Sequence, residues 1–250
     1  MMKNAKLLMG GALLPIALSA PVVNAEDSPH SFSANVAFTT DYLFRGISQT
    51  EGNPAIQGGF DYEYSGDVIP VSFYAGIWGS NIDFNDGADA TLEADYYGGI
   101  TGDLMDTGIS WDIGVIYYDY PSSESSADYE YIEWGGGLGY TFENVQFSPE
   151  IGVYAWYSPD FFASTGDAIY INPSLGLSLP YGLSLSFAYG YQDVDDIGEY
   201  DHFSVGLSKD WNIFTFDVTY SDTFDTSDDF CAGGLDLCDS TVVFTVSSSF

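Results

Sequence analysis

Basic residues are scarce in this chain. Four lysines and arginines stand against 37 aspartates and glutamates among 250 residues, and the formal net charge is −33. A surface of this sign repels the phosphate backbone, so nucleic acid is excluded as a partner. Charge of this size is also typical of disordered chains, but an aromatic content of 17% indicates a folded protein instead.

Long hydrophobic runs are missing after the first 25 residues. Lys3 and Lys6 precede an uncharged stretch at 7–20, and Val23-Asn24-Ala25 offers a cleavage site of the small-x-small type. The stretch is too short to cross a bilayer as a helix. The pattern therefore predicts a secretory signal peptide at 1–25.

The remaining domain, 26–250, keeps two basic residues, Arg45 and Lys209, and a formal charge of −35. Every apolar run within it is interrupted after a few residues by Gly, Asp, Ser or Asn. Only helices and closed barrels satisfy their backbone in lipid. If this domain enters a membrane, it must therefore cross with strands.

Cysteine and histidine are also rare. The close spacing of Cys231 and Cys238 in an exported chain predicts a local loop disulfide rather than a metal site. His202 and Ser204 lie on one strand face without an orienting third group, and phosphate loops, zinc spacings and nucleophile elbows are missing. We expect no enzyme, no cofactor and no dedicated metal site. Acidic segments such as 193–199 and 222–229 leave open weak divalent binding or simple solvation.

What the sequence does contain is alternation. In the last stretch, Val242, Phe244 and Val246 alternate with Val243, Thr245 and Ser247, and the sequence finishes on Phe250. A period of two is typical of a strand. A bare terminal strand invites pairing with other chains unless it closes a barrel with the first strand, although an edge strand of a secreted sandwich is the alternative. The pattern resembles the assembly signal of bacterial outer-membrane barrels, from which Ser248 departs.

Alternation of this kind predicts twelve strands, an even number as in bacterial single-chain barrels. Their expected ranges are 32–40, 54–64, 71–79, 90–100, 109–118, 129–140, 146–157, 168–179, 183–191, 201–208, 212–220 and 241–250. Several are close to the roughly 9–11 residues that cross a bilayer at a tilt. The sequence therefore predicts an all-β fold, a transmembrane antiparallel β-barrel.

The connections alternate in length, as outer loops and periplasmic turns do in such barrels. The long, acidic connections are 41–53, 80–89, 119–128, 158–167, 192–200 and 221–240. The shorter ones are 65–70, 101–108, 141–145, 180–182 and 209–211. Tyrosines and tryptophans fall mostly near strand ends, where interfacial aromatic belts lie.

The polar face of each strand must point into the lumen, because a carboxylate facing lipid costs up to a few kcal/mol. We expect the pore to be lined by Asp61, Glu63, Glu93, Asp95, Asp112, Glu150 and Asp217. Acids with almost no bases among them would favour cations over anions.

Arg45 is the residue of greatest interest, since it is one of two cations at 26–250 and lies beyond the first strand. One interpretation folds it inward to pair with a lumen acid such as Glu93 or Asp95, which would narrow the pore mouth. The other leaves it in a surface loop, bonded to Asp41.

Several segments resemble one family. These are DYLFRGISQT at 41–50, PAIQGGF at 54–60, FYAGIWGSN at 73–81, YYDYP at 117–121 and, more loosely, YSPDF at 157–161. They are similar to the signatures of the TorF family of porin-like proteins. That resemblance implies an outer-membrane barrel of a Gram-negative bacterium, and it implies no particular site residue.

These observations predict an outer-membrane porin, an ion channel or transport pore for passive diffusion of small hydrophilic solutes or cations. Its other partners would be outer-membrane lipid and the barrel-assembly machinery, which would read the strand ending in Phe250. A non-conducting barrel with a structural or surface-binding role is one alternative, and a secreted β-sandwich that binds a ligand is another.

Overall fold

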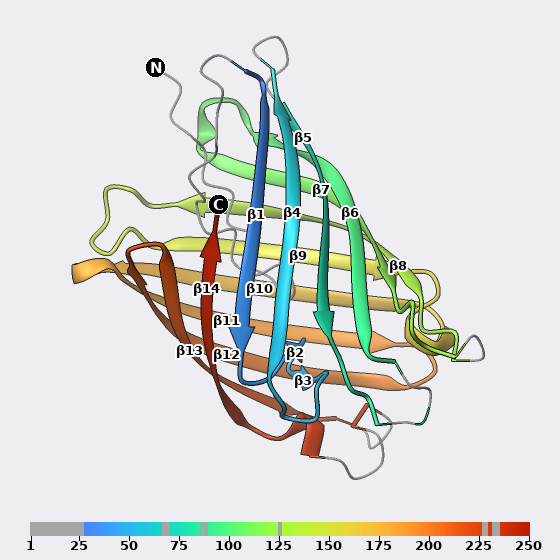
Figure 1. Cartoon of the computed structure of the whole chain (residues 1–250). Helices are drawn as coiled ribbons and strands as arrows, with labels where there is room; N and C mark the ends of the chain where they lie inside the picture. The colour runs from blue at the N-terminus through green and yellow to red at the C-terminus, as the bar shows by residue number, and fades with distance from the viewer. Residues whose placement is uncertain are drawn as a thin grey trace.

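The computed structural model describes residues 28–66, 71–85, 87, 90–124, 127–226, 230–231 and 236–250. The expected signal peptide lies outside the described residues. Twelve antiparallel strands form one closed barrel, which confirms the predicted fold (Figure 1). Chain neighbours are sheet neighbours throughout, so the barrel is a simple up-and-down meander.

The wall of the barrel is made of strands of nine to fourteen residues. They are β1 (His30–Thr39), β4 (Ala55–Ser65), β5 (Val71–Asn81), β6 (Leu92–Asp103), β7 (Ile109–Asp119), β8 (Tyr131–Thr141), β9 (Glu150–Ser158), β10 (Ala168–Leu179), β11 (Leu183–Val194), β12 (Gly198–Trp211), β13 (Phe214–Phe224) and β14 (Thr241–Ser249). The two short strands β2 (Leu43–Phe44) and β3 (Ile47–Ser48) pair with each other in a separate two-stranded sheet.

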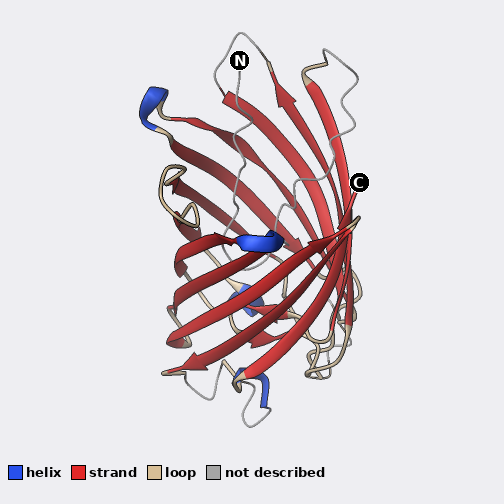
Figure 2. Ribbon diagram, turned by 90° about the vertical axis from the view of Figure 1, so that its left-hand side faces the viewer, coloured by secondary structure: helices blue, strands red, loops and turns tan. Residues whose placement is uncertain are grey.

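Within the described residues, helical structure is confined to single 3₁₀ turns between strands: η1 (Met105–Thr107), η2 (Phe162–Ser164), η3 (Pro180–Gly182) and η4 (Asp236–Cys238) (Figure 2). Across the described ranges, no helix is both long and apolar enough to cross a membrane.

The last strand closes the barrel against the first. β14 pairs with β1 from Thr39 opposite Thr245 to Asn35 opposite Ser249. Phe250 then continues the ladder, because its amide donates to the Ala34 carbonyl at 2.8 Å and its carbonyl accepts from the Ala34 amide at 3.1 Å. Closure of this kind removes the exposed sheet edges that would invite aggregation.

The outer face of the wall is apolar. Val242, Phe244 and Val246 are 49%, 54% and 36% exposed, whereas Val243 between them is buried. The same alternation places Phe60 and Ile77 outward on β4 and β5. An outward apolar surface with an inward polar one is the pattern of a barrel embedded in lipid, not of a sandwich with a dry interior.

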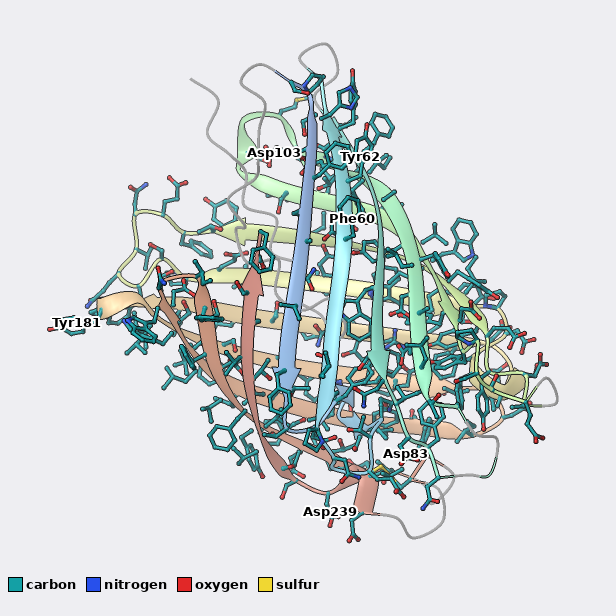
Figure 3. All side chains as sticks on the ribbon, in the orientation of Figure 1. Phe60, Tyr62, Asp83, Asp103, Tyr181 and Asp239 are labelled. Atoms are coloured by element: carbon teal, nitrogen blue, oxygen red, sulfur yellow. A yellow bond between two sulfur atoms is a disulfide. The ribbon has the colours of Figure 1, made fainter. Side chains whose placement is uncertain are left out.

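The two ends of the barrel differ. The turn end carries the start of β1 near His30, the end of β14 near Phe250, and the shorter connections between strands. The loop end carries the longer connections. In Figure 3, Asp103 marks the turn end, and Asp83 and Asp239 mark the loop end.

At the loop end, tyrosine hydroxyls on the outward face donate to carboxylates. These bonds are Tyr157 to Asp167 at 2.9 Å, Tyr220 to Asp222 at 3.3 Å, Tyr189 to Asp201 and Tyr191 to Glu199. Tyrosine rings that face lipid while their hydroxyl groups reach water are typical of an interfacial aromatic belt.

Several connections differ from their expected lengths, and two of them depart from the expected alternation of long and short. The expected long loop at 192–200 is only 195–197, because β11 and β12 stay paired as far as Val194 and Gly198. The expected short turn at 141–145 extends over 142–149. There the chain reverses through Phe147 and Ser148 with φ of 68° and 41°, and the Phe147 carbonyl accepts from the Ser178 amide at 2.7 Å.

Candidate functional site

The first loop, 40–54, folds into the barrel and not away from it. We call its residues 41–50 the plug hairpin. Its ladder pairs Leu43 with Ser48 and Phe44 with Ile47, and the chain turns between them at Arg45 and Gly46 with φ of 49° and 86°. The hairpin begins beside β4 at the loop end (Figure 1).

Contacts with distant parts of the wall place the plug hairpin in the lumen. The Tyr42 hydroxyl donates to Glu93 of β6 at 2.9 Å, and the Gly46 carbonyl accepts from Thr223 of β13 at 2.9 Å. A Cβ on Gly46 would lie 2.4 Å from the Thr223 Oγ1 atom. Only glycine fits at this contact, because the position needs both a left-handed backbone and no side chain.

Asp41 organises the base of the plug hairpin. Its Oδ1 atom accepts from Ser48 Oγ at 2.7 Å and from Thr50 Oγ1 at 2.9 Å, and its carbonyl accepts from Thr39 Oγ1 at 2.8 Å. The carboxylate is therefore engaged with the hairpin itself. It is not the partner of Arg45.

Arg45 crosses the lumen to the far wall and is 2% exposed. Its Nη2 atom lies 2.6 Å from Glu133 Oε2 of β8, and its Nη1 atom donates to Gln192 Oε1 of β11 at 2.6 Å. The guanidinium carbon lies 4.1 Å from the centre of the Tyr170 ring of β10. The inward interpretation of Arg45 thus describes its position, but its partner is Glu133 and neither Glu93 nor Asp95.

Electrostatics keep this arginine charged. Burial alone lowers the pKa of Arg45, but the Glu133 carboxylate at 2.6 Å more than offsets that effect and raises the pKa above its ordinary value. The Tyr118 hydroxyl donates a further bond to Glu133 Oε2 at 3.0 Å. The pair is therefore an ion pair with additional hydrogen bonds, the arrangement that a buried charge requires.

Aromatic side chains fill the lumen around the plug hairpin at the loop end. Tyr118 stacks on Tyr131 at 4.3 Å between ring centres, and Tyr129 stacks on Phe162 of η2 at 4.4 Å. Phe84 packs edge-on against the same Phe162 ring at 5.5 Å. The loop end of the lumen is therefore closed in this structure.

Two of the predicted lumen acids lie within this closed region. Glu93 and Asp95 are 1% and 3% exposed on adjacent inward positions of β6. Glu93 accepts from Tyr42, whereas Asp95 Oδ1 has no hydrogen-bond partner among the described residues. With Glu133, this part of the lumen holds three buried carboxyl groups, of which only Glu133 contacts the Arg45 guanidinium.

The other predicted acids lie on inward positions nearer the turn end. Asp112 is buried and accepts from the Tyr74 hydroxyl at 3.2 Å, and Asp61 accepts from the Tyr97 hydroxyl at 2.5 Å. Asp217 and Glu150 are half-buried, and Glu63 is exposed. All seven acids thus share the lumen face, while their role in lining an open pore stays a prediction.

Glu133, Gln192 and Tyr170 form most of the site around Arg45, and the sequence did not single them out. Each occupies an inward position of an alternating strand. Glu133 stands out in hindsight, because Ile132 and Trp134 flank it on the lipid side. The sequence feature that could have identified Glu133 is a carboxylate at an inward position near the loop end.

His202 is buried in the lumen beside the tip of the plug hairpin. Its Nε2 atom lies 2.9 Å from the Tyr170 hydroxyl, and its Nδ1 atom has no partner in the part of the chain that the structure describes. No hydrogen bond joins it to Ser204 among these residues.

The disulfide between Cys231 and Cys238 is present, which confirms the predicted pairing. It closes the loop that contains η4, and η4 contacts β3 of the plug hairpin. The last outer loop therefore supports the plug from the loop end.

Acidic segments do not converge on a metal site in the described residues, where no group of three or more His, Cys, Asp or Glu could hold a metal ion. The segment 193–199 is a tight hairpin end. Part of the second segment, 227–229, lies outside the described residues.

Several solved structures share the fold of this chain. The KdgM porin in complex with disordered oligogalacturonate is 7% identical with a TM-score of 0.52 over 87% of this chain and 98% of that one. An outer-membrane channel from Pseudomonas putida F1 is 8% identical with a TM-score of 0.52 over 89% and 95%. Outer membrane phospholipase A from Escherichia coli is 12% identical with a TM-score of 0.50 over 87% and 95%. At these identities the likeness concerns the fold alone: this chain has the closed antiparallel β-barrel fold that these outer-membrane proteins share.

The sequence itself places the chain in a family. Residues 24–250 match the family described as "Bacterial protein of unknown function (Gcw_chp)", and the chain belongs to it. That description does not carry the name TorF, so the finer identification stays a prediction. Among curated proteins, no sequence matches this chain.

Proposed function

We propose that this protein is an outer-membrane channel for passive diffusion of small hydrophilic solutes, with a preference for cations, and that the plug hairpin closes it. The observation that carries the proposal is the set of buried lumen carboxylates Glu93, Asp95 and Glu133. Buried ion pairs contribute little to stability compared with apolar packing, so acids at these positions point to a function other than filling the barrel.

Opening requires the plug hairpin to leave the far wall. Release of Arg45 would remove the one buried cation that the lumen holds in the described ranges, and the inward acids would then face water. A pore lined with one sign of charge concentrates counter-ions and repels co-ions. Transport would involve no reaction and no energy coupling, so the proposed protein is not an enzyme.

Cellular placement follows from the sequence signals. A signal peptide at 1–25 would direct export, the barrel-assembly machinery would bind the terminal strand with Phe250, and the apolar outer face would then contact outer-membrane lipid.

Single-channel recording tests the proposal. Refolded wild-type barrel and the Arg45→Ala variant are placed in a planar bilayer under a salt gradient, with Lys209→Ala as the matched control. Lys209 is the other cation of the domain, but it bonds the Tyr181 carbonyl at the turn end. Arg45→Ala should increase conductance with a cation-selective reversal potential, and Lys209→Ala should behave as wild type.

The closed loop end favours a second candidate, a non-conducting barrel whose acidic loops bind at the cell surface. The packing of Tyr129, Phe162 and Phe84 supports it, because these rings close the mouth independently of Arg45. Heat-modifiable migration on gels first shows that wild type and Arg45→Ala are folded. If neither folded protein then conducts in the bilayer, the result favours this function over the channel.

A further inference from the structure

The pocket around Arg45 belongs to the barrel wall and not to the plug. Glu133 comes from β8, Gln192 from β11 and Tyr170 from β10, and each is fixed by the strand ladder. The plug hairpin supplies the guanidinium and the neighbouring Phe44 ring, 4.7 Å from its carbon. Withdrawal of the plug would leave the three wall side chains in place. We call them the lumen cage.

The lumen cage matches a guanidinium in particular. One terminal nitrogen meets a carboxylate at 2.6 Å, the other meets an amide oxygen at 2.6 Å, and a tyrosine face covers the plane at 4.1 Å. A planar, delocalised cation presents donors at the spacing that these two acceptors need, and it stacks on a ring. A compact ammonium or sodium ion offers no such plane, and a neutral solute of the same shape lacks the charge.

Acidic side chains near the lumen cage outnumber its one guanidinium. Glu93 and Asp95 are at least 97% buried next to the plug, and Asp95 Oδ1 lacks a partner among the described residues. An unpaired buried acceptor loses hydration without compensation. A ligand with a second cationic group would therefore suit the site better than a single guanidinium.

We infer that the lumen cage is a binding site for guanidinium-bearing solutes and that Arg45 occupies it as a tethered internal ligand in the closed state. The inference rests on the proposed channel only in that a solute must reach the lumen. A tethered group has a high effective concentration, so a free solute competes poorly in the wild type and well once Arg45 is removed.

Calorimetry on the folded barrel in detergent tests the inference without any conduction. Guanidinium chloride at low millimolar concentration is titrated into wild type and Arg45→Ala at constant ionic strength. Urea serves as the neutral planar control and sodium chloride as the cation control. Arg45→Ala should bind guanidinium at least about tenfold more tightly than wild type does, and agmatine, which adds an ammonium, more tightly still. Urea and sodium should give no comparable signal.

Two further variants locate the site. Arg45→Ala/Glu133→Gln should lose at least about tenfold in guanidinium affinity. Arg45→Ala/Glu63→Gln should not, because Glu63 is exposed at the turn end. If Arg45→Ala does not fold, Arg45→Gln takes its place, since it retains a polar side chain without the charge.

The inference is overturned if the folded Arg45 variant binds guanidinium no better than sodium or urea, or if Glu133→Gln leaves the affinity unchanged. Either result leaves the channel proposal intact when the same variant conducts. Guanidinium binding in a barrel that stays silent would uphold the lumen cage and contradict the channel.

Discussion

Replacement of Arg45 by Met should release the plug hairpin from the lumen. In the docked state the change leaves Glu133, which is 1% exposed, without its cation. Breaking a buried ion pair by removing one partner costs about 3–5 kcal/mol. At about 1.4 kcal/mol per factor of ten, the docking equilibrium falls roughly a hundredfold to a few thousandfold. The hydrogen bond from Thr223 to Gly46, which remains in the variant, stabilises the docked hairpin by only about 1 kcal/mol.

Hydrogen exchange measured by mass spectrometry reports this release directly. The Gln49 amide donates to the Tyr42 carbonyl at 2.7 Å, and the Asp83 amide donates to the Gln49 carbonyl at 2.9 Å. Both should exchange faster in Arg45→Met, while the amides of the wall strands stay protected.

The double variant Arg45→Met/Glu133→Leu is the matched control. Replacing both partners by apolar groups of similar volume is often neutral, so protection of the plug hairpin should largely return. If the single variant exchanges at the wild-type rate, packing of residues such as Phe44 holds the plug, and the ion pair is not its main attachment.

Three further predictions concern the supports of the plug and the closure of the barrel. Gly46→Ala should weaken docking of the hairpin by about 1–3 kcal/mol, because φ is 86° and the new Cβ meets Thr223. Unchanged hydrogen exchange in the plug hairpin would contradict this. Joint replacement of Cys231 and Cys238 by Ser should lower the free energy of unfolding in urea by about 2 kcal/mol or less. Hydrogen exchange measured by mass spectrometry should rise mainly in the plug hairpin; a rise confined to the wall strands would refute support of the plug by η4. Phe250→Ala should reduce the amount of folded barrel in cell membranes but leave the refolded barrel nearly as stable, because the backbone bonds to Ala34 remain; an equal loss in both assays would contradict recognition of the terminal side chain.

Local periodicity was sufficient to predict the fold. Alternation around Asp61, Glu93 and Asp95 defines the inward face of each strand, because successive side chains point to opposite sides. The terminal strand could be matched to the first because a closed barrel leaves no edge, and the structure pairs them. These features depend on neighbours in sequence or on one general rule of strand pairing.

The partner of Arg45 could not be predicted in the same way. Which of the lumen acids it meets depends on the path of a loop across the barrel and on the shear of strands far apart in sequence. Glu133 lies 88 residues from Arg45, and no local pattern links the two. The long loop expected at 192–200 was wrong for a different reason. Asp193 and Glu199 suggest a loop by composition, but charged side chains are compatible with strand pairing at the loop end.

The most direct test of the central claim is the conductance of the Arg45→Ala barrel beside wild type and Lys209→Ala in a planar bilayer under a salt gradient. A channel closed by the plug hairpin predicts larger, cation-selective steps for Arg45→Ala alone. Identical currents in all three folded proteins, or silence in all three, would contradict it.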